Sequence, residues 1–511
     1  MVAAIAFGPF SACLPGETAI GVASPAADLA CRPDPVHEHA VPDFHIDAEH
    51  GNDRNAGSSA APWKTLAKGL AVRGPASIFV RDGNYGVLAE TAGARRSAYL
   101  TLRAAPGAVP VITGIKLSYP VMTTTFLRLM GFQIRPDHRN GGSIVQVSKG
   151  TDVELSNNSI SAVKYAAATS TPGSPRSFDG ISLNDTERIA IKSNCITSVF
   201  RGIQASGSRD VTIKRNYITP QSGSAIQYLS RNSNFLIEDN HIRGQDHVPY
   251  PSDPDAYKDP HASIVSIRSG DIVIRNNVMH GMGTSSGIMF YLPDVTGGLA
   301  AYSNVSIDGN LIYDVRNDQV LRLYSVADNV VVRNNLVVSR HRREPASCDG
   351  ITNDARYRFN TALNVHSVAS GYDGSGLTVA NNIFIGMASI PGKAIERNNI
   401  AWSFNSDGKF LAASPSKSTK IVTSEYQGCG KHPRYFESLF FVGNVQFTGE
   451  HGRLLDFRPA KSSGVRNAGD TSMQTERILG PLDGNGWFVN EGGYRKAGEH
   501  SIGPYEFRDA H

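Results

Sequence analysis

The chain has 511 residues, with 50 Lys or Arg against 46 Asp or Glu, so its formal net charge is only +4. No long run of like charges and no apolar stretch of 18 residues occurs, which argues against nucleic-acid binding and against a membrane-spanning segment. The mild positive charge permits an anionic partner without requiring one. Fifty glycines and 27 prolines indicate many turns.

Residues 1–43 are expected to form a leader outside the folded domain. MVAAIAFGPFSAC has a short apolar stretch and small residues before Cys13, but no basic start. The tetrapeptide ending at Cys13 resembles a degenerate bacterial lipoprotein box, which implies a secreted, periplasmic or outer-surface location. A disordered leader explains the same residues. Cys13 with Cys31, and Cys348 with Cys429, could pair in an oxidising compartment, whereas Cys195 is expected to be buried.

The next predicted element is a short amphipathic helix near residues 63–72, in the stretch PWKTLAKGLA. It is the only place where helical periodicity is clear. A helix here would suit the exposed end of a stack of strands, because the first strand layer has unpaired edges and an open core.

A nine-residue pattern then recurs seven times. Each copy is a short alternating apolar strand, a polar bend with Asn at the seventh position, and another apolar pair. The copies are DVELSNNSI (152–160), RIAIKSNCI (188–196), DVTIKRNYI (210–218), NFLIEDNHI (234–242), DIVIRNNVM (271–279), NVSIDGNLI (304–312) and NVVVRNNLV (329–337).

The spacing of the bend asparagines is close to 22–25 residues where no insertion intervenes, as between Asn194 and Asn216. A strand-rich unit of this length cannot cover its own apolar face, so neighbouring units must stack. We therefore predict an all-β, right-handed parallel β-helix of about 9–11 coils, with the asparagines hydrogen-bonded in a ladder. Unrelated Asn-rich turns are the alternative.

Weaker copies of the pattern extend the stack. FLRLMGFQI (126–134) lacks the Asn, and GLTVANNIF (376–384) keeps it at Asn382. The distance of 47 residues from Asn335 to Asn382 fits two coils, the first of which would lack the recognisable pattern. The predicted organisation is a β-helix at 44–400 followed by C-terminal coils and a cap at 401–511.

Residues 44–75 carry a family resemblance. FHIDAEHGNDRNAGSSAAPWKTLAKGLA and the following IFVRDGNYG (78–86) resemble the opening of secreted pectate-lyase-like β-helix proteins. LDFRPAKSSGVRNAG (455–469) and SIGPYEF (501–507) resemble their C-terminal closure. The resemblance implies the fold but not the reaction, since this superfamily includes lyases, hydrolases, epimerases and non-catalytic adhesins. No catalytic motif of the family can be placed residue by residue.

A second strand follows each Asn bend, and alternation predicts a polar row along its outer face. The first row contains Ser182, Gln204, Gln227, Ser266, Met289 and Arg322. The next row contains Arg268, Tyr291 and Tyr324, and the strand entrances hold Asp179 and Arg201. At about 4.8 Å per coil this face spans roughly 25 Å. Amides, guanidiniums and phenols suit an extended sugar polymer, although a solvated sheet face is also polar.

Three insertions, at 163–178, 243–262 and 339–359, fall between an Asn bend and the following strand, and would wall one edge of this face. The second insertion is rich in candidate chemistry. Asp253, Asp255 and Asp259 are hard oxygen ligands of the kind that Ca²⁺ requires, although Asp-Pro pairs are also ordinary turn formers. Lys258 and His261 could carry protons, and solvated loop charges explain them equally well.

The sequence favours a polysaccharide lyase acting on a uronic-acid polymer. Lys258 or His261 would remove the C5 proton, Arg268 and Arg322 would neutralise the carboxylate, and Tyr291 would protonate the leaving oxygen. Asp179, Arg201, Gln204, Gln227 and Tyr324 would bind substrate. No organic cofactor is expected, and a monomer is favoured over a trimer. The alternatives are a glycoside hydrolase with paired carboxylates and a non-catalytic glycan-binding surface or fibre protein.

Overall fold

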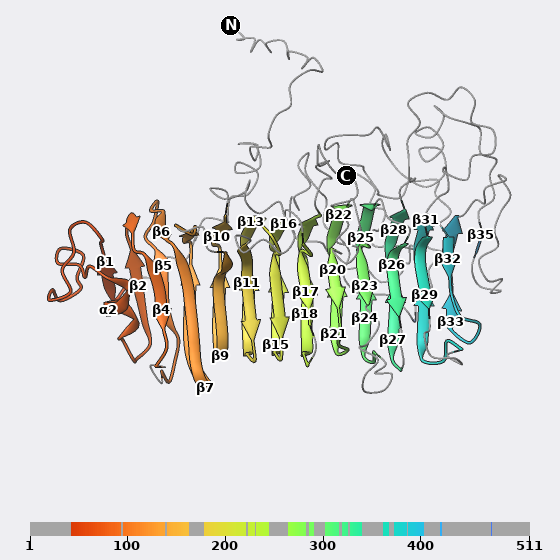
Figure 1. The fold of residues 1–511 in the computed structure, drawn as a ribbon, viewed down its shortest axis with the longest axis horizontal. Coiled ribbons are helices and arrows are strands. Elements are labelled where there is room, and N and C mark those ends of the chain that lie inside the picture. Colours follow the sequence, from red (N-terminus) through yellow and green to blue (C-terminus); the bar gives the residue numbers. More distant parts are fainter. Residues whose placement is uncertain are drawn as a thin grey trace, which may run out of the picture.

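The computed structural model describes residues 42–421 with internal gaps, together with Ser472. The gaps are 93–95, 138–140, 163–177, 221–222, 230, 245–263, 283–285, 291–301, 316–318, 325–327, 340–360, 367–372, 386 and 403–419. In the described part, short strands follow one another along one long axis (Figure 1). All pairings between neighbouring strands are parallel, as a solenoid requires.

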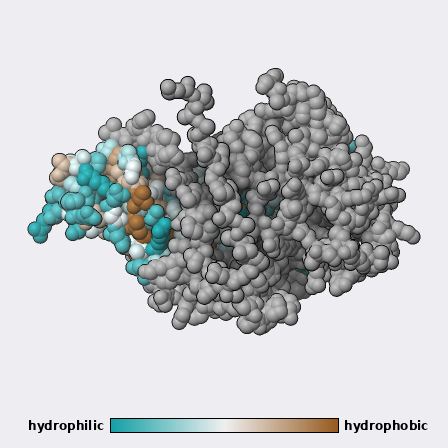
Figure 2. Space-filling model, turned by 90° about the horizontal axis from the view of Figure 1, so that it is seen from above, coloured by the Kyte–Doolittle hydropathy of each residue, from teal (hydrophilic) through white to brown (hydrophobic). Residues whose placement is uncertain are grey.

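The N-terminal end is closed by β1 (Phe44–Ile46) and the helix α2 (Leu66–Leu70). Thr65 caps the helix, since its side chain accepts a hydrogen bond from the Lys68 amide. Leu66 and Leu70 are buried against the first coils. The helix was predicted in this place, and it is shorter than the pattern at 63–72 suggested. Seen from above, this end carries mainly hydrophilic atoms around a small hydrophobic patch (Figure 2).

Each coil contributes strands to three stacks, which we call front, middle and back. The front stack contains β4 (Val87–Glu90), the first part of β7 (Gly114–Met130), the first part of β9 (Gly142–Ser156), β11 (Phe178–Asn184), β14 (Ile203–Ser206), β17 (Ile226–Tyr228), β20 (Val265–Ile267), β23 (Ile288–Phe290), β26 (Gln319–Tyr324), β29 (Thr361–His366) and β32 (Met387–Ser389).

The middle stack joins the front stack through β7 and β9, which bend from one to the other and make a single 22-stranded sheet. Besides β1 and the second parts of β7 and β9, it contains β2 (Ala76–Val80), β5 (Leu100–Ala104), β12 (Glu187–Lys192), β15 (Arg209–Lys214), β18 (Ser233–Glu238), β21 (Ile272–Arg275), β24 (Val305–Asp308), β27 (Val330–Arg333), β30 (Leu377–Ala380) and β33 (Ile395–Arg397).

The back stack is a separate 13-stranded sheet. It contains β3 (Gly83–Asn84), β6 (Pro110–Ile112), β8 (Gln133–Ile134), β10 (Ser159–Ser161), β13 (Cys195–Val199), β16 (Tyr217–Pro220), β19 (His241–Arg243), β22 (Val278–Met282), β25 (Leu311–Val315), β28 (Leu336–Ser339), β31 (Ile383–Ile385), β34 (Ile400–Trp402) and β35 (Lys420–Ile421).

The core lies inside the three stacks and is built by strict alternation. In β14, for example, Ile203 is fully buried and the next residue, Gln204, points outward and is half-buried. In β15, Ile213 is fully buried and the residue before it, Thr212, points outward and is half-buried. Ile, Leu and Val from successive coils thus form one continuous hydrophobic core. Branched side chains stack well on a pleated surface, which explains their dominance at the inward positions.

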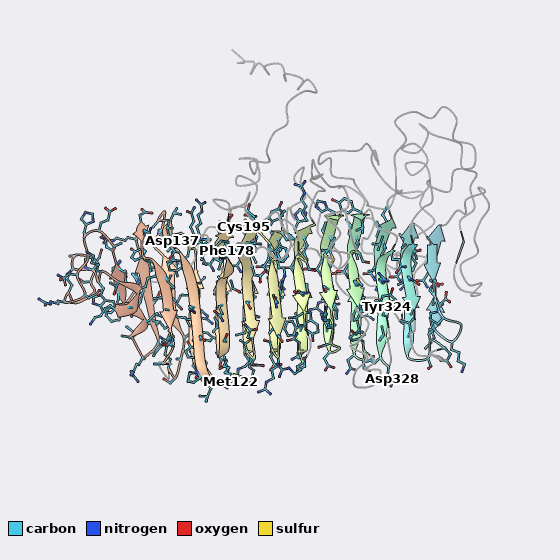
Figure 3. All side chains as sticks on the ribbon, viewed as in Figure 1. Met122, Asp137, Phe178, Cys195, Tyr324 and Asp328 are labelled. Carbon is cyan, nitrogen blue, oxygen red and sulfur yellow. The ribbon has the colours of Figure 1, made fainter. Side chains whose placement is uncertain are left out.

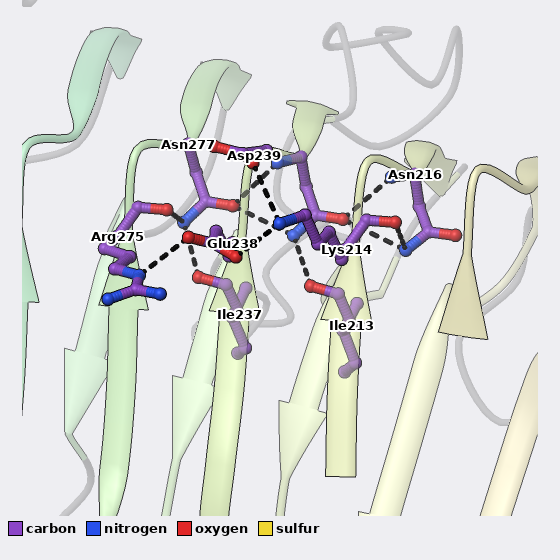
Figure 4. A network of polar contacts seen from close by, with 9 residues as sticks. Ile213, Lys214, Asn216, Ile237, Glu238, Asp239, Arg275 and Asn277 are labelled. Atoms are coloured by element: carbon purple, nitrogen blue, oxygen red, sulfur yellow. Dashed lines mark hydrogen bonds and ion pairs between the residues drawn. The ribbon is translucent and has the colours of Figure 1, made fainter. Parts of the chain in front are cut away.

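The predicted asparagine ladder is present at the bend between the middle and back stacks. Its members, all almost fully buried, are Asn158, Asn194, Asn216, Asn240, Asn277, Asn310, Asn335, Asn382 and Asn399. Each Nδ2 donates to the Oδ1 of the next asparagine, as from Asn216 to Asn240 at 3.0 Å and from Asn240 to Asn277 at 2.9 Å. Figure 4 shows three consecutive bends of this ladder.

The residue before each ladder asparagine adopts a left-handed backbone conformation, with φ between 49° and 65°. Asn, Asp, Ser and Gly therefore recur at the sixth position of the pattern, because they tolerate positive φ better than branched residues. The members of this set are Asn157, Ser193, Arg215, Asp239, Asn276, Gly309, Asn334, Asn381 and Asn398.

One expectation about the stack was wrong. Asn335 donates directly to Asn382 at 2.9 Å, and β28 pairs with β31, so these 47 residues form one coil with a long insertion and not two coils. The front stack has 11 strands, at the upper end of the predicted 9–11 coils, and the back stack has 13. The early coils lack the ladder asparagine, and Asn399 follows Asn382 after only 17 residues, so the repeat does not mark these coils.

Cys195 opens β13 on the outside of the back stack, at the upper edge in Figure 3, and is buried as expected. It is also disulfide-bonded, which the sequence did not predict. The other four cysteines lie outside the described residues. Because the chain has five cysteines and Cys195 is bonded to one of these four, at most one of the predicted pairs Cys13–Cys31 and Cys348–Cys429 can form.

Candidate functional site

The strand pairing of the front stack confirms the predicted outer row. Ser182 pairs with Gln204, Gln204 with Gln227, Gln227 with Ser266, Ser266 with Met289, and Met289 with Arg322. The row also continues in both directions. Lys116 and Gln146 precede Ser182, and Asn364 follows Arg322. Residues that are remote in the sequence therefore form one line along the outer face, one coil apart.

Four predicted substrate-binding residues meet at one point of this face. Arg201 lies at the entrance of β14, and its Nη1 donates to Gln204 Oε1 at 2.6 Å and to Gln227 Oε1 at 3.2 Å. Its Nε lies 3.7 Å from Asp179 Oδ1 on the preceding coil. The guanidinium also lies over the Phe200 ring, 5.0 Å from the centroid. We call Asp179, Arg201, Gln204 and Gln227 the arginine cluster.

The arginine cluster presents hydrogen-bond donors to the solvent. Both glutamine oxygens point to Arg201, so both amide NH₂ groups are turned away from it. Within the described part of the chain, these two groups and Arg201 Nη2 have no protein partner. The arginine and glutamine side chains are half-buried, so their donors are accessible but fixed. Such a group suits carboxylate and hydroxyl oxygens of a bound ligand.

Asp179 is the acidic member of the arginine cluster and is mostly buried. Burial raises its pKa above the ordinary value, and the charge of Arg201 offsets only part of this effect. Because the folded pKa is raised, the folded state holds the proton more tightly than the unfolded state. The stability of the protein therefore falls as the pH rises through this window.

We expect Asp179→Asn to stabilise the protein at neutral pH, because it removes the cost of ionising a buried carboxyl group. The advantage should vanish at about pH 3, where the wild-type carboxyl is protonated in both states. Thermal unfolding midpoints of wild type and variant across the pH range provide the measurement. Asp328, an exposed carboxylate labelled at the lower edge in Figure 3, gives the control variant Asp328→Asn. A variant less stable than wild type at neutral pH would show that the Arg201 ion pair outweighs burial.

Polar atoms without partners continue beyond the arginine cluster. Ser266 Oγ, Ser286 Oγ and Gln319 Oε1 are buried and have no hydrogen-bond partner. They lie on β20, at the entrance of β23 and on β26, which are consecutive coils of the front stack. Buried polar atoms are normally paired, so these unpaired atoms mark places where an enclosed water would restore the missing hydrogen bonds.

A second group lies further along the front stack. The Arg322 guanidinium lies 4.3 Å from the centroid of the Tyr324 ring, and Tyr324 packs against Met289. Tyr324 is only 7% exposed, and Figure 3 places it on the strands of the front stack. Arg322 covers one face of the Tyr324 ring, so a sugar ring can contact only the ring edge unless Arg322 moves away.

Several predicted residues lie outside the described part of the chain. They are Lys258, His261 and Tyr291 of the proposed catalytic set and the candidate calcium ligands Asp253, Asp255 and Asp259. Arg268 is described and exposed, directly after β20 and two residues beyond Ser266 of the central row. The roles of all these residues remain predictions.

The three insertions do join the fold at one edge. They connect β10 to β11, β19 to β20 and β28 to β29, and in each case the chain passes from the back stack to the front stack. The ladder asparagines on both sides of the first two insertions are bonded directly, so the extra residues add no coil. The predicted common edge beside the polar row is therefore confirmed.

Within the described ranges, no three His, Cys, Asp or Glu side chains are grouped closely enough to hold a metal ion. The same part of the chain has no helix long and apolar enough to cross a membrane. Asp253, Asp255 and Asp259 lie outside these ranges, so calcium binding there remains a proposal.

Sequence reasoning missed Lys116, Gln146, Ser286 and Gln319 as members of the face. Lys116 and Gln146 lie in coils without the bend asparagine, so no repeat marked their register. Ser286 and Gln319 stand at strand entrances like Asp179 and Arg201, and the same offset from each strand would have found them.

The fold and this face define a parallel β-helix protein with a polar strip along one strand stack. Residues 137–248 match the family described as a right-handed beta helix region. No curated protein matches the sequence. The family match and the observed coils confirm the predicted right-handed parallel β-helix.

Solved structures with a similar fold are distant in sequence. Pectate lyase Pel9A is 13% identical, with 87% of this chain and 96% of that chain aligned at a TM-score of 0.40. An alginate lyase from Paenibacillus sp. str. FPU-7 is 15% identical over 50% of this chain and 85% of its own, at 0.34. The Dettilon tailspike protein is 12% identical over 68% and 62%, at 0.38. Similarity at this level concerns the fold alone.

Proposed function

We propose that the front face binds an acidic polysaccharide and that the protein is a lyase that cleaves it by β-elimination. The observation that supports the proposal is the arginine cluster, where a fixed guanidinium and two amide groups direct free N–H donors outward. Carboxylates of a uronic-acid chain are acceptors that match these donors, and sugar hydroxyls match the amides.

The extended row fits a polymer better than a small ligand. From Lys116 to Arg322 the row crosses seven coil steps, or roughly 34 Å at about 4.8 Å per step. Lys116, Arg201 and Arg322 distribute positive charge along this length. A polyanion can contact all three at once, which a monosaccharide cannot.

β-Elimination needs a neutralised carboxylate, a base for the C5 proton and a donor for the leaving oxygen. Arg201 or Arg322 would neutralise the carboxylate. Lys258 or His261 remains the proposed base and Tyr291 the proposed proton donor. Arg268, exposed beside the row, would hold a neighbouring carboxylate. Calcium at Asp253, Asp255 and Asp259 would assist neutralisation if it binds there.

A glycoside hydrolase is the second candidate, and the described face disfavours it. Hydrolysis requires two carboxyl groups that are about 5–10 Å apart across the scissile bond. Among the described residues of the central and entrance rows, Asp179 is the only carboxylate. Asp179 also pairs with Arg201, which makes it a poor partner for a second acid.

The test is incubation of the protein with a panel of uronate polymers, including polygalacturonate and polymannuronate. We expect ultraviolet absorbance to rise as an unsaturated sugar forms at the new non-reducing end. New reducing ends without that absorbance would indicate a hydrolase. Binding without cleavage of any polymer would indicate a glycan-binding surface protein.

A further inference from the structure

Four aromatic rings from consecutive coils lie in contact on the outer side of the back stack. They are Tyr217 on β16, His241 on β19, His280 on β22 and Tyr313 on β25. Tyr217 meets His241 edge to face, with 5.2 Å between the ring centroids, and Tyr313 lies parallel to His280 at 4.8 Å. His241 is 2% exposed and His280 is half-buried. The two imidazoles are therefore held in place between two phenol rings.

The two histidines meet nitrogen to nitrogen. Nε2 of His241 lies 2.8 Å from Nε2 of His280, and the ring centroids are 5.0 Å apart with the ring planes inclined by 25°. A ring nitrogen lies roughly 1.1 Å from the centroid of its imidazole, so a straight contact between the two nitrogens requires about 5.0 Å between the centroids. The observed separation matches this value. The contact is therefore a nearly linear N–H···N hydrogen bond, in which one ring donates and the other accepts.

This geometry limits how many protons the folded pair can bind. An added proton on the donating ring goes to its Nδ1 and leaves the N–H···N bond intact. A second added proton would turn the acceptor into a donor, so two N–H groups and two positive charges would face each other across 2.8 Å. The folded pair therefore takes up at most one proton, whereas the two histidines of the unfolded chain take up two.

The neighbours of the pair also oppose protonation. Arg243 of β19 pairs with His280 in the strand register. Among the described side chains that strand pairing places beside the two histidines, it is the only charged one, since β16 and β25 contribute the neutral phenols of Tyr217 and Tyr313. Burial lowers the pKa of the His280 imidazole well below its ordinary value, and His241 and Arg243 lower it further.

The histidine pair lies where the second insertion begins. The backbone N–H of Gly244 donates to the carbonyl oxygen of His280 at 2.6 Å, and the N–H of Val278 donates to that of Asn240 at 2.9 Å. Gly244 is the last described residue before the gap at 245–263. A disturbance of the histidine pair therefore acts on the backbone bonds between β19 and β22 at this point.

We propose that His241 and His280 form an acid-sensitive joint between β19 and β22, which holds these two coils together at neutral pH and weakens at acidic pH. The folded pair binds fewer protons than the unfolded chain. Its contribution to stability is therefore fully present above the ordinary histidine pKa of about 6.5 and is lost as the pH falls below it. The coil contact at the start of the insertion that carries Lys258 and His261 is then firmest at neutral pH.

The direct test is nuclear magnetic resonance of the full-length protein with nitrogen-15-labelled histidine, with the two rings assigned from spectra of His241→Gln and His280→Gln. Between about pH 8 and about pH 5 we expect no more than one of the two Nε2 atoms to carry a hydrogen in the folded protein. Two protonated Nε2 atoms in the folded protein at about pH 5 would overturn the proposal.

The two glutamine variants add a thermodynamic readout. A glutamine amide can donate to or accept from the remaining imidazole, so either variant accommodates a protonated partner. Between about pH 7 and about pH 5, the unfolding equilibrium constant in urea should rise about twentyfold more for wild type than for either variant. Hydrogen exchange, corrected for its intrinsic pH dependence, should locate the added opening at residues 240–244 and 278–280.

His50→Gln is the matched control, because His50 is exposed in the loop between β1 and α2. It should follow wild type at both pH values. The same pH dependence in wild type and in both His241→Gln and His280→Gln would overturn the proposal.

Discussion

Replacing Arg201 with alanine should weaken the binding of acidic oligosaccharides by about a hundredfold, or ~3 kcal/mol. Arg201 is the only residue that contacts Asp179, Gln204 and Gln227 together among the described side chains of the front face. Its loss removes the charged donor and also leaves both glutamines without their orienting partner. The measurement is calorimetric titration with oligogalacturonate and oligomannuronate at constant ionic strength, since charge contacts depend on salt.

Two further variants separate charge from geometry. Arg201→Lys keeps the positive charge but cannot donate to two amides from one planar group, so its affinity should lie between wild type and alanine. Arg54→Ala removes an exposed positive charge from the loop between β1 and α2, several coils before the arginine cluster, and should bind like wild type. If Arg201→Ala retains affinity within about twofold, the arginine cluster is not a ligand site.

Replacing Asn240 with alanine should destabilise the fold by about 3–5 kcal/mol. Asn240 is fully buried in the middle of the ladder. Its Nδ2 donates to Ile213 O at 2.8 Å and to Asn277 Oδ1 at 2.9 Å, and its Oδ1 accepts from the backbone and side chain of Asn216. Alanine would leave all of these groups in a dry interior, where each unmade bond is costly.

The effect should be measured as the free energy of unfolding in urea, with hydrogen exchange to locate local opening in the stack. Asn329→Gly is the control. Asn329 is exposed, has φ of 57° and donates one hydrogen bond to Asn304. Glycine keeps that backbone conformation, so a loss below about 1 kcal/mol is expected. An Asn240 variant no less stable than the Asn329 variant would show that the ladder is not a main source of stability.

Charged residues beside the ladder connect neighbouring coils. Glu238, almost fully buried, accepts hydrogen bonds from Lys214 at 2.8 Å and from Arg275 at 2.8 Å, so it connects three consecutive coils (Figure 4). A buried carboxylate held by two cations fixes the register of those coils more than it adds net stability. The repeat alone did not reveal this network, because the sign of the charge changes from Lys214 to Glu238 and again to Arg275.

The sequence alone determined the architecture and the register of the front face. Asn at the seventh position and a residue tolerant of positive φ before it are local requirements of one bend, so they recur wherever a coil recurs. Alternation in the strand that follows then places Gln204, Gln227 and Arg322 in one line. Both features depend on the geometry of a few neighbouring residues, so they can be predicted directly from the sequence.

Only the tertiary structure decided how many coils lie between two asparagines and how the side chains of the face are arranged. Asn335 and Asn382 are neighbours because hydrogen bonds across coils select the pairing, whatever the length of chain between them. Arg201 turns toward Gln204 and Gln227 because acceptor groups from three consecutive coils lie within reach of its guanidinium. Leu311 and Leu336 are fully buried although they face away from the main hydrophobic core. Long side chains and covering segments respond to contacts between distant residues, and a local pattern does not encode those contacts.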